Sequence, residues 1–328
     1  MINVEEILRV ENLRINFITE DGVVKAIDGV SFSLKRGEVL GIVGETGCGK
    51  SVTAHAILRL LPQPPAQIVG GRVVFEGKNL LDLSEDEMNK IRGNGIAMIF
   101  QEPMTSLNPA FTIKEQMVDV ITLHRNVSKK EAVEIAASAL RDVKLPQPEI
   151  ILNKYPHELS GGQRQRVMIA MALSCQPKIL IADEPTTALD VTIQAQILNL
   201  IKNLQEKYKM SVMIITHDMG VVAQISDRVA VMYAGNVVEI GDVKEVLKSP
   251  IHPYTKGLLK SIPKIENPNE RLETIPGSVP NLIDPPSGCR FHPRCSIRND
   301  ICEKKKPLLE EVKKGRYVAC YMIGRDSP

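Results

Sequence analysis

The sequence predicts an α/β protein whose core is a mostly parallel β-sheet covered by helices on both faces. Two observations lead to this prediction. A glycine-rich loop at residues 44–51 stands between a short apolar run and a helical pattern. Two further apolar runs, at 178–184 and 212–216, end in polar or charged side chains and are separated by a helical stretch. Strands that alternate with helices and carry functional groups at their ends are typical of such a sheet.

Length, charge and the start of the chain limit the class of protein. With 328 residues the chain has room for one large or two moderate domains. Its formal net charge is only +2, which indicates no nucleic-acid-binding surface. No apolar run approaches the roughly 20 residues that a membrane span requires. The acidic residues Glu5 and Glu6 stand where a signal peptide would carry basic ones, so we expect a cytosolic chain.

Residues 44–51 (GETGCGKS) match the phosphate-binding pattern G-x-x-x-x-G-K-[ST]. An expected strand over 38–43 precedes them and an expected helix over 52–60 follows. The glycines let backbone N–H groups surround a phosphate, and the helix N-terminus adds partial positive charge. The sequence therefore predicts a nucleoside triphosphate site. Its candidate residues are Gly44, Glu45, Thr46, Gly47, Cys48, Gly49, Lys50, Ser51 and Thr53.

The N-terminal part is expected to form antiparallel strands. Residues 7–43 alternate apolar and polar side chains, with turn signals at 20–22 and 35–37. The protein has no tryptophan, so few side chains can stack on a base. Phe17 ends one predicted strand and is our candidate for stacking on adenine. An ordinary strand phenylalanine is the alternative interpretation.

A helical insertion is expected between two halves of the α/β core. Residues 61–72 are rich in proline and glycine and predict a loop. A short acidic helix and a strand follow over 73–100, and Gln101 comes directly after that strand. From 112 to 158 the pattern is helical. We place the inserted helical subdomain at about 105–165.

Residues 159–163 (LSGGQ) open a predicted helix over 164–174. Ser160 has the side chain of a helix N-cap. The two glycines after it leave room for a ligand at the positive end of the helix. The candidate residues of this motif are Ser160, Gly161, Gly162 and Gln163.

Further polar groups stand at the ends of the two apolar strands. The first strand ends in Asp183 and Glu184, and the sequence TALD, which closes with Asp190, follows shortly after. The second strand delivers His217 and Asp218 at its carboxyl end. In a parallel sheet these ends meet at one edge, where ligands bind.

Beyond residue 250 the composition changes and proline recurs, which predicts a linker and a small cysteine-rich appendix over 251–328 that does not extend the sheet. In a reducing compartment four clustered cysteines suggest a metal before disulfides. The spacing C-x5-C-x6-C-x17-C lacks the paired knuckles of common zinc sites and suits an iron–sulfur cluster, with zinc and two disulfides as alternatives. The four residues are Cys289, Cys295, Cys302 and Cys320.

Neighbouring residues in this tail are interpreted in the same way. Basic side chains between the cysteines would offset the charge of a cluster with four thiolates, namely Arg290, Arg294, Arg298 and Lys304, Lys305 and Lys306. His292 could replace a ligand, but next to Pro293 a structural role is favoured. Because the tail lies outside every motif of the nucleotide site, we expect it to have a structural role. Cys48 and Cys175 are interpreted as small apolar residues.

Together these motifs resemble the nucleotide-binding subunit of ABC transporters. A phosphate-binding loop alone is shared with GTPases, kinases and helicases, but residues 159–163 resemble the far more specific ABC signature. No Asn-Lys-x-Asp motif for guanine is present. Gln101, residues 187–190 and His217 match the Q-, D- and H-loops in order. Over about 1–250 the resemblance implies an ABC-type P-loop NTPase core, with a RecA-like sheet and an antiparallel β subdomain.

A narrower resemblance covers nearly the whole chain. Residues 101–109 (QEPMTSLNP), 252–255 (HPYT) and 276–295 are similar to the ATP-binding subunits of oligopeptide/dipeptide and nickel importers, the first of the two ATPases of such systems. It implies a second ATPase subunit, two membrane permeases and an extracytoplasmic peptide-binding protein, at the cytoplasmic face of the inner membrane. It also implies a four-iron cluster on the four tail cysteines. Dipeptides, longer peptides and nickel stay open as cargo.

The resemblance also implies how ATP and Mg²⁺ are held. Lys50 and the loop amides would bind the phosphates. Ser51, and Asp183 through water, would bind Mg²⁺. Gln101 would sense the γ-phosphate and Mg²⁺ and couple the site to the membrane subunits.

Hydrolysis is assigned to two further residues. Glu184 would polarise the attacking water, and His217 would contact the γ-phosphate and orient that water. Residues 160–163 would complete the site of a partner in a head-to-tail dimer. Two alternatives remain from other classes. A soluble ABC ATPase acting on nucleic acid usually carries a coiled-coil insertion or a second cassette, which this chain lacks, and a non-hydrolysing regulatory subunit would lack catalytic residues that are present here.

Overall fold

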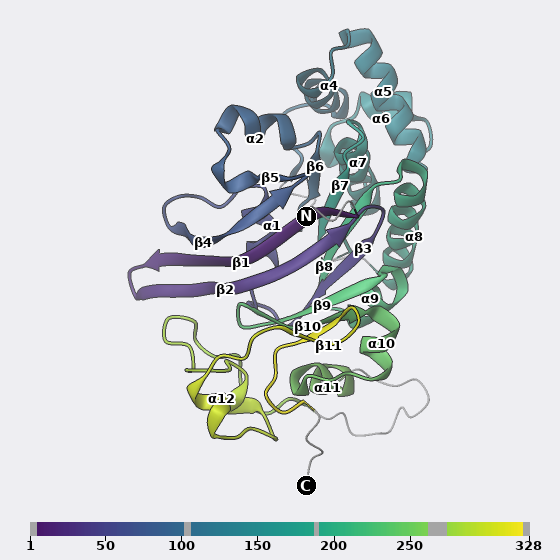
Figure 1. Ribbon diagram of the computed structural model, residues 1–328. Helices are drawn as coiled ribbons and strands as arrows, with labels where there is room; N and C mark the ends of the chain where they lie inside the picture. Colours follow the sequence, from purple (N-terminus) through teal and green to yellow (C-terminus); the bar gives the residue numbers. More distant parts are fainter. Residues whose placement is uncertain (1–4, 102–105, 187–189, 262–273, 324–328) are drawn as a thin grey trace. The chain divides into compact units, whose positions relative to one another are not determined.

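The computed structural model describes residues 5–101, 106–186, 190–261 and 274–323 (Figure 1). It divides into two compact units. Unit 1 contains residues 1–34, 40–81 and 216–328, and unit 2 contains residues 35–39 and 82–215. The division therefore does not follow the predicted boundary at residue 250, since the C-terminal region belongs to the same unit as the N-terminal strands.

Unit 1 contains an antiparallel sheet with strand order β2-β1-β4-β5. Its strands are β1 (Glu6–Thr19), β2 (Gly22–Lys35), β4 (Ala66–Phe75) and β5 (Lys78–Asn79). The alternating pattern of the N-terminal part therefore predicted the first two strands correctly. The predicted loop over 61–72 was wrong from Ala66 onward, because β4 pairs with β1 along most of its length.

Glycine explains why this strand resembled a loop. The register of β1 against β4 shifts beside Glu11 and Arg14, and Gly71 lies opposite with φ of 98°. A Cβ atom at Gly71 would lie 2.5 Å from the Cα atom of Leu13. Glycine is thus required where the two backbones approach at a bulge, and it does not end the strand.

A second set of strands in unit 1 has the order β11-β12-β10-β9-β3. These are β3 (Val39–Val43), β9 (Arg228–Tyr233), β10 (Asn236–Asp242), β11 (Glu310–Lys313) and β12 (Arg316–Val318). Strand β3 pairs in parallel with β9. The helices of this unit are α1 (Lys50–Ile57), α9 (Met219–Ile225), α10 (Val243–Lys248), α11 (Pro253–Lys260), the 3₁₀ turn η3 (His292–Arg294) and α12 (Asp300–Lys304).

The C-terminal region extends this sheet, contrary to our expectation. Strand β12 pairs antiparallel with β10 and with β11. The sequence signal was short: Tyr317 and Val318 follow Gly315, whose φ of 75° allows the tight turn. The appendix interpretation is therefore wrong for residues 310–318, which form the edge of the sheet.

A buried ion pair joins β12 to β10. The guanidinium Nη2 of Arg316 lies 2.6 Å from a carboxylate oxygen of Glu239, and the two side chains are 3% and 0% exposed. The carboxylate of Glu239 also accepts hydrogen bonds from the backbone N–H groups of Ile251 and His252, at 2.8 and 3.1 Å. A buried carboxylate needs such partners, because burial in the protein interior removes its hydration.

Residues of the C-terminal region also take part in the apolar core of unit 1. Phe291 is buried with Tyr233 and Tyr254 in one cluster that includes β9 residues and helix α9 residues. The ring centroids of Tyr233 and Phe291 are 5.1 Å apart in an edge-on arrangement. Cys289 and Cys295 pack against the same cluster. The cysteine-bearing segment is therefore part of this core.

Unit 2 is built on three strands in the order β8-β7-β6, all parallel. They are β6 (Ile96–Ile99), β7 (Ile179–Asp183) and β8 (Ser211–Thr216). Between β6 and β7 the chain is helical, as predicted, with α4 (Ile113–His124), α5 (Lys129–Asp142), α6 (Pro148–Leu152), η2 (Pro156–Glu158) and α7 (Gly161–Leu173). The remaining helices are α2 (Glu85–Ile91) and α8 (Val191–Tyr208), and the 3₁₀ turn η1 (Leu80–Asp82) spans the point where the chain passes from unit 1 to unit 2.

The helix starts in unit 2 follow directly from the sequence. Helices α2, α4, α5 and α7 each begin with a reciprocal capping box, formed by a Ser or Thr N-cap and a Glu or Gln three residues later. Each box satisfies backbone N–H groups that the first turn leaves without partners. None of the described helices combines the length and apolar character needed to span a bilayer.

The Arg316–Glu239 pair yields a stability prediction. Replacing Arg316 with Met leaves the carboxylate of Glu239 buried without its cation, which should lower the free energy of unfolding by about 3–5 kcal/mol. The control is Lys313→Met, because the Lys313–Glu245 ion pair is solvent-exposed and should contribute only about 0–1 kcal/mol. Urea denaturation measures both values, and equal losses would contradict the assignment.

Candidate nucleotide-binding site

The phosphate-binding loop connects β3 to α1 in unit 1, as predicted. Gly44 lies against β9, where a Cβ atom would come within 2.1 Å of the carbonyl oxygen of Met232. Gly49 has φ of 101° and is the N-cap of α1. The carbonyl of Cys48 accepts a hydrogen bond from the N–H of Gly235 at 2.9 Å. The loop is therefore fixed against the end of β9, and two of its glycines are required by geometry.

The side chain of Lys50 lies on this loop. It is 6% exposed, and its Nζ donates to the carbonyls of Gly44 and Glu45, at 2.7 and 3.1 Å. Cys48 is fully buried, as expected for a small apolar residue, and burial raises the pKa of its thiol. The hydroxyl of Thr53 donates to the carbonyl of Gly49 at 2.9 Å inside the helix. Thr53 therefore supports the loop from within α1.

In unit 2 the structure brings Gln101 and Glu184 together. The side-chain Nε2 of Gln101 donates to Oε2 of Glu184 at 3.0 Å. Asp183 is buried at the end of β7. The N–H of Glu184 donates to the carbonyl of Ile215 at 2.8 Å. Glu184 has φ of 45°, a left-handed conformation that is uncommon outside glycine and is often found at functional sites.

One supporting residue was missed from the sequence. Gln165 is 1% exposed, and its Nε2 donates to the carbonyl of Pro185 at 2.7 Å. This bond fixes the backbone directly after Glu184. In the sequence, Gln165 is a polar residue at a position on the apolar face of the helix over 164–174. Hydrophobic periodicity alone would assign a polar side chain to the surface, so it did not identify Gln165.

The signature motif begins helix α7, and its capping role is confirmed. The hydroxyl of Ser160 accepts from the N–H of Gln163 at 3.3 Å, while the side chain of Gln163 accepts from the N–H of Ser160 at 3.0 Å. Ser160 and Gly161 are exposed. A Cβ atom at Gly161 would meet nothing within 4 Å. The start of this helix is therefore open to a ligand or partner.

The other predicted site residues lie at ends of elements. Asp190 is the N-cap of α8 and accepts from the N–H of Ile193 at 2.9 Å, while residues 187–189 lie outside the described part of the chain. His217 is exposed after β8 in unit 1. Phe17 is half-buried near the end of β1 and pairs with Ala66 of β4.

The structure gathers the four tail cysteines around one small cavity. Cys289, Cys295, Cys302 and Cys320 line a space of about 10 Å³, together with His252, Phe291 and His292. The N–H of Cys289 donates to the carbonyl of Cys302 at 2.8 Å. All four residues are free thiols. Burial raises the pKa of Cys289 to about 11, and it also raises the pKa of Cys295 and of Cys320.

This arrangement is not a formed metal site. Among the residues that the structure describes, no group of three or more ligating side chains is placed to hold a metal ion. The cavity of about 10 Å³ is also only at the lower limit of the roughly 10–15 Å³ that one water needs. The donor set nevertheless suits a soft metal, because thiolates select zinc, copper(I) or iron–sulfur clusters. The four thiols therefore suit a soft metal chemically, but the cavity between them would have to widen to hold one.

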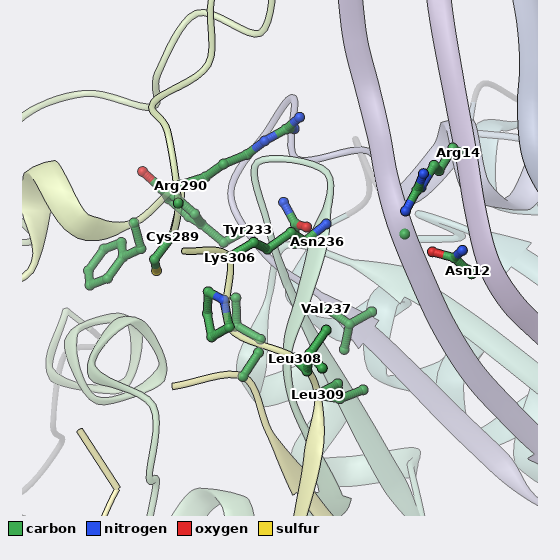
Figure 2. Close-up of a pocket in the computed structure, with 16 residues that line it drawn as sticks. Asn12, Arg14, Tyr233, Asn236, Val237, Cys289, Arg290, Lys306, Leu308 and Leu309 are labelled. Atoms are coloured by element: carbon green, nitrogen blue, oxygen red, sulfur yellow. The ribbon is translucent and has the colours of Figure 1, made fainter. Parts of the chain in front are cut away.

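A larger cavity of about 140 Å³ lies elsewhere in unit 1 (Figure 2). Arg14, Arg290 and Lys306 line it, together with Asn236. Two of these cations are paired with the carboxylate of Asp28, Lys306 at 2.8 Å and Arg290 at 3.6 Å. No residue of the phosphate-binding loop lines this cavity. It is therefore separate from the nucleotide site, and one carboxylate is shared by two of its three cations.

Comparison with protein families finds two matches on the chain. Residues 27–187 match the family described as "ABC transporter". Residues 238–302 match "Oligopeptide/dipeptide transporter, C-terminal region". The second match covers the segment with three of the four tail cysteines, so this region is characteristic of that branch of transporters.

Curated relatives are similar over nearly the whole length. A probable peptide ABC transporter ATP-binding protein of Sinorhizobium fredii is 53% identical over 96% of this chain and 94% of its own length. The oligopeptide transport ATP-binding protein OppD of Bacillus subtilis is 51% identical, with 100% and 92% covered. The dipeptide transport ATP-binding protein DppD of Escherichia coli is 45% identical, with 96% of each chain covered.

Solved structures give the same result for the fold. A dimeric ATP-binding cassette, MJ0796, bound to ADP and phosphate superposes with a TM-score of 0.64 at 30% identity, covering 72% of this chain and 98% of that one. The cassette cbiO1 of Clostridium perfringens has the same TM-score at 31% identity, with 75% and 92% covered. With its motifs in order and its relatives aligned end to end, the chain belongs to the ABC transporter family, as an ATP-binding subunit of the oligopeptide/dipeptide branch.

Proposed function

We propose that this chain hydrolyses ATP to power the import of dipeptides or oligopeptides through an ABC transporter. The observation that carries the proposal is the match of its C-terminal region to oligopeptide/dipeptide transporters, together with relatives of that function along the full chain. A nickel importer of the same type remains the second candidate. In functional terms, residues 1–250 form the nucleotide-binding part, with its helical insertion at about 105–165, and 251–328 the cysteine-bearing part.

Glu184 is proposed to polarise the attacking water. Its carboxylate accepts a hydrogen bond from Gln101, which orients the side chain. The bond from Gln165 to Pro185 fixes the backbone that carries it. Phosphoryl transfer needs mainly positioning and charge stabilisation, which this arrangement supports. His217, exposed after β8, is proposed to orient the same water.

The remaining residues are proposed to bind ATP and Mg²⁺. Lys50 and the amides of residues 44–51 hold the phosphates, with Phe17 against adenine. Ser51 would bind Mg²⁺ directly, Asp183 would do so through water, and Gln101 would sense the occupied site. When bound, Mg²⁺ would neutralise part of the negative charge of the phosphates. The burial of Lys50 on its loop supports its role as a preorganised phosphate ligand.

The signature motif is proposed to act on the ATP of a partner subunit. Ser160 and Gly161 are exposed at the start of α7, where helix N-terminal N–H groups attract phosphate. With Gly162, Gln163 and Asp190, they would complete the site of a second, homologous ATPase in a head-to-tail heterodimer. Two membrane permeases and an extracytoplasmic peptide-binding protein complete the proposed assembly, which places the chain on the cytoplasmic face of the membrane.

The four tail cysteines are proposed to hold a [4Fe–4S] cluster, with zinc as the alternative. Their convergence on one cavity supports the proposal. A bound metal favours thiolates, so binding would release protons from these thiols and would strengthen as the pH rises. The cluster would supply a structural cross-link within residues 289–320.

The role of Glu184 can be tested directly. Glu184→Gln keeps the hydrogen bond to Gln101 possible but removes the base, so ATP turnover in the assembled transporter should fall by about 100-fold or more, while ATP binding persists. Glu206→Gln, an exposed position on α8, is the matched control. Near-normal ATPase activity of Glu184→Gln would refute the assignment.

The composite site predicts that the isolated chain is a weak ATPase. Its specific activity should rise with protein concentration or on addition of the partner subunit, since half of each site comes from another chain. Steady-state ATPase assays over a dilution series measure this dependence. If a dilute monomer were fully active, the assignment of Ser160–Gln163 to a partner's site would be wrong.

The metal proposal predicts the colour of the protein. Anaerobically purified protein should be brown, with about four iron and four sulfide per chain. Replacing any one tail cysteine with Ser should bleach it, whereas Cys175→Ser should not. Colourless protein with one zinc per chain would select the alternative, and metal-free protein would contradict both.

A further inference from the structure

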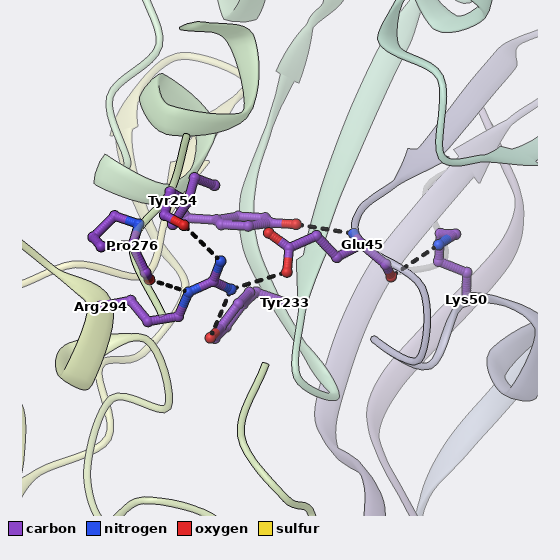
Figure 3. A network of polar contacts seen from close by, with 7 residues as sticks. Glu45, Lys50, Tyr233, Tyr254, Pro276 and Arg294 are labelled. Atoms are coloured by element: carbon purple, nitrogen blue, oxygen red, sulfur yellow. Dashed lines mark hydrogen bonds and ion pairs between the residues drawn. The ribbon is translucent and has the colours of Figure 1, made fainter. Parts of the chain in front are cut away.

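Glu45, the second residue of the phosphate-binding loop, is held at three points (Figure 3). Its N–H donates to the hydroxyl of Tyr254 at 2.9 Å. Its carbonyl accepts from Nζ of Lys50 at 3.1 Å. Its carboxylate accepts from Nη1 of Arg294 at 2.9 Å. Two of these three contacts come from the C-terminal region, which we had expected to lie outside every motif of the nucleotide site.

The guanidinium of Arg294 is fixed by its surroundings. The side chain is 8% exposed. Its Nε donates to the carbonyl of Pro276 at 2.9 Å and its Nη2 to that of Ile275 at 3.4 Å. The group also lies over the ring of Tyr233, 5.7 Å from the centroid. Carbonyls and a ring orient the cation without neutralising it, so the carboxylate of Glu45 provides its opposite charge.

Tyr254 is positioned with similar rigidity. It is fully buried and packs against Tyr233, with ring centroids 4.7 Å apart. Its N–H donates to Nδ1 of His252, the N-cap of α11, at 3.1 Å. Complete burial lowers the pKa of His252 to about 3, so this imidazole stays neutral and can accept the bond. The N–H of His252 is in turn bonded to Glu239. The hydroxyl of Tyr254 is therefore presented at a set point beside the loop.

We propose that Arg294 and Tyr254 are positioning residues of the nucleotide site, which act on ATP through Glu45. Arg294 neutralises the carboxylate of Glu45, and Tyr254 fixes the loop backbone from which Lys50 reaches the phosphates. The inference rests on the proposed ATP site but does not depend on the cargo or on a metal at the cysteines.

The electrostatic reason concerns the charge of ATP. A carboxylate within a phosphate-binding loop repels the polyanion, and the repulsion is strong where solvent screening is weak. The pairing with Arg294 removes most of that repulsion. Arg294 is the last residue of η3, three residues after Phe291. Because Phe291 is buried in the core of unit 1, the segment that carries the guanidinium is anchored there.

A competing explanation is a purely structural link between the C-terminal region and the loop. Such a link would affect the melting temperature and leave the affinity for ATP unchanged. The two explanations therefore differ in whether KM for ATP moves separately from kcat and from stability.

The first experiment uses the assembled transporter. Arg294→Met should raise KM for ATP about tenfold, with kcat within about twofold of the wild type. The matched control is Arg298→Met, and its KM should not change. The side chain of Arg298 is half-exposed, and its described contacts are with Glu303, His292 and Pro293 of the tail. A wild type that fails to bind ATP would instead overturn the proposed function.

The second experiment completes a double-mutant cycle. Adding Glu45→Gln to Arg294→Met removes the unpaired charge, so KM should return to within about threefold of the wild type. Tyr254→Phe removes a single oxygen and keeps the packing, so it provides a test even if Arg294→Met folds poorly. Tyr254→Phe should raise KM about threefold. An unchanged KM with a lowered melting temperature, or a double variant as impaired as Arg294→Met, would overturn the inference.

Discussion

The buried carboxylate of Glu239 is the constraint on which much of unit 1 depends. It is fully buried and binds the guanidinium of Arg316, so it attaches strand β12 to the sheet. It also binds the N–H groups at the start of α11. That helix carries Tyr254, whose hydroxyl contacts the phosphate-binding loop at Glu45. One desolvated charge thus joins the sheet edge to a helix start, because it is satisfied only when both partners are in place, and this helix in turn carries Tyr254 to the loop.

Local motifs allowed most of the candidate site to be predicted. The phosphate-binding loop, the cap of Ser160 on α7 and the strand that ends at Asp183 all depend on neighbouring residues, so their sequence patterns are sufficient. The contact between Gln101 and Glu184 joins the ends of β6 and β7, two strands that pair directly. It could be anticipated from the topology of a parallel sheet, where functional groups gather at one edge.

The contacts of the C-terminal region could not be predicted in this way. Tyr254 and Arg294 reach Glu45 across 209 and 249 residues, and no periodicity records such pairs. The composition of the tail, rich in proline and cysteine, suggested an appendix, whereas Phe291 and Val318 are buried with the core. The short hairpin of β11 and β12 was missed because four and three residues are too few to show a clear alternation.

The position of Arg316 has a consequence for how this protein can be shortened. A minimal cassette ending near residue 250 would match the extent of the solved cassettes, which cover about three quarters of the chain. In this chain such a cut would remove Tyr254, Phe291 and Arg316 together, leaving a buried acid without its base and an aromatic face open to water. The C-terminal region is therefore an integral part of the fold of unit 1. We expect that the nucleotide-binding part cannot be separated from it by a cut near residue 250.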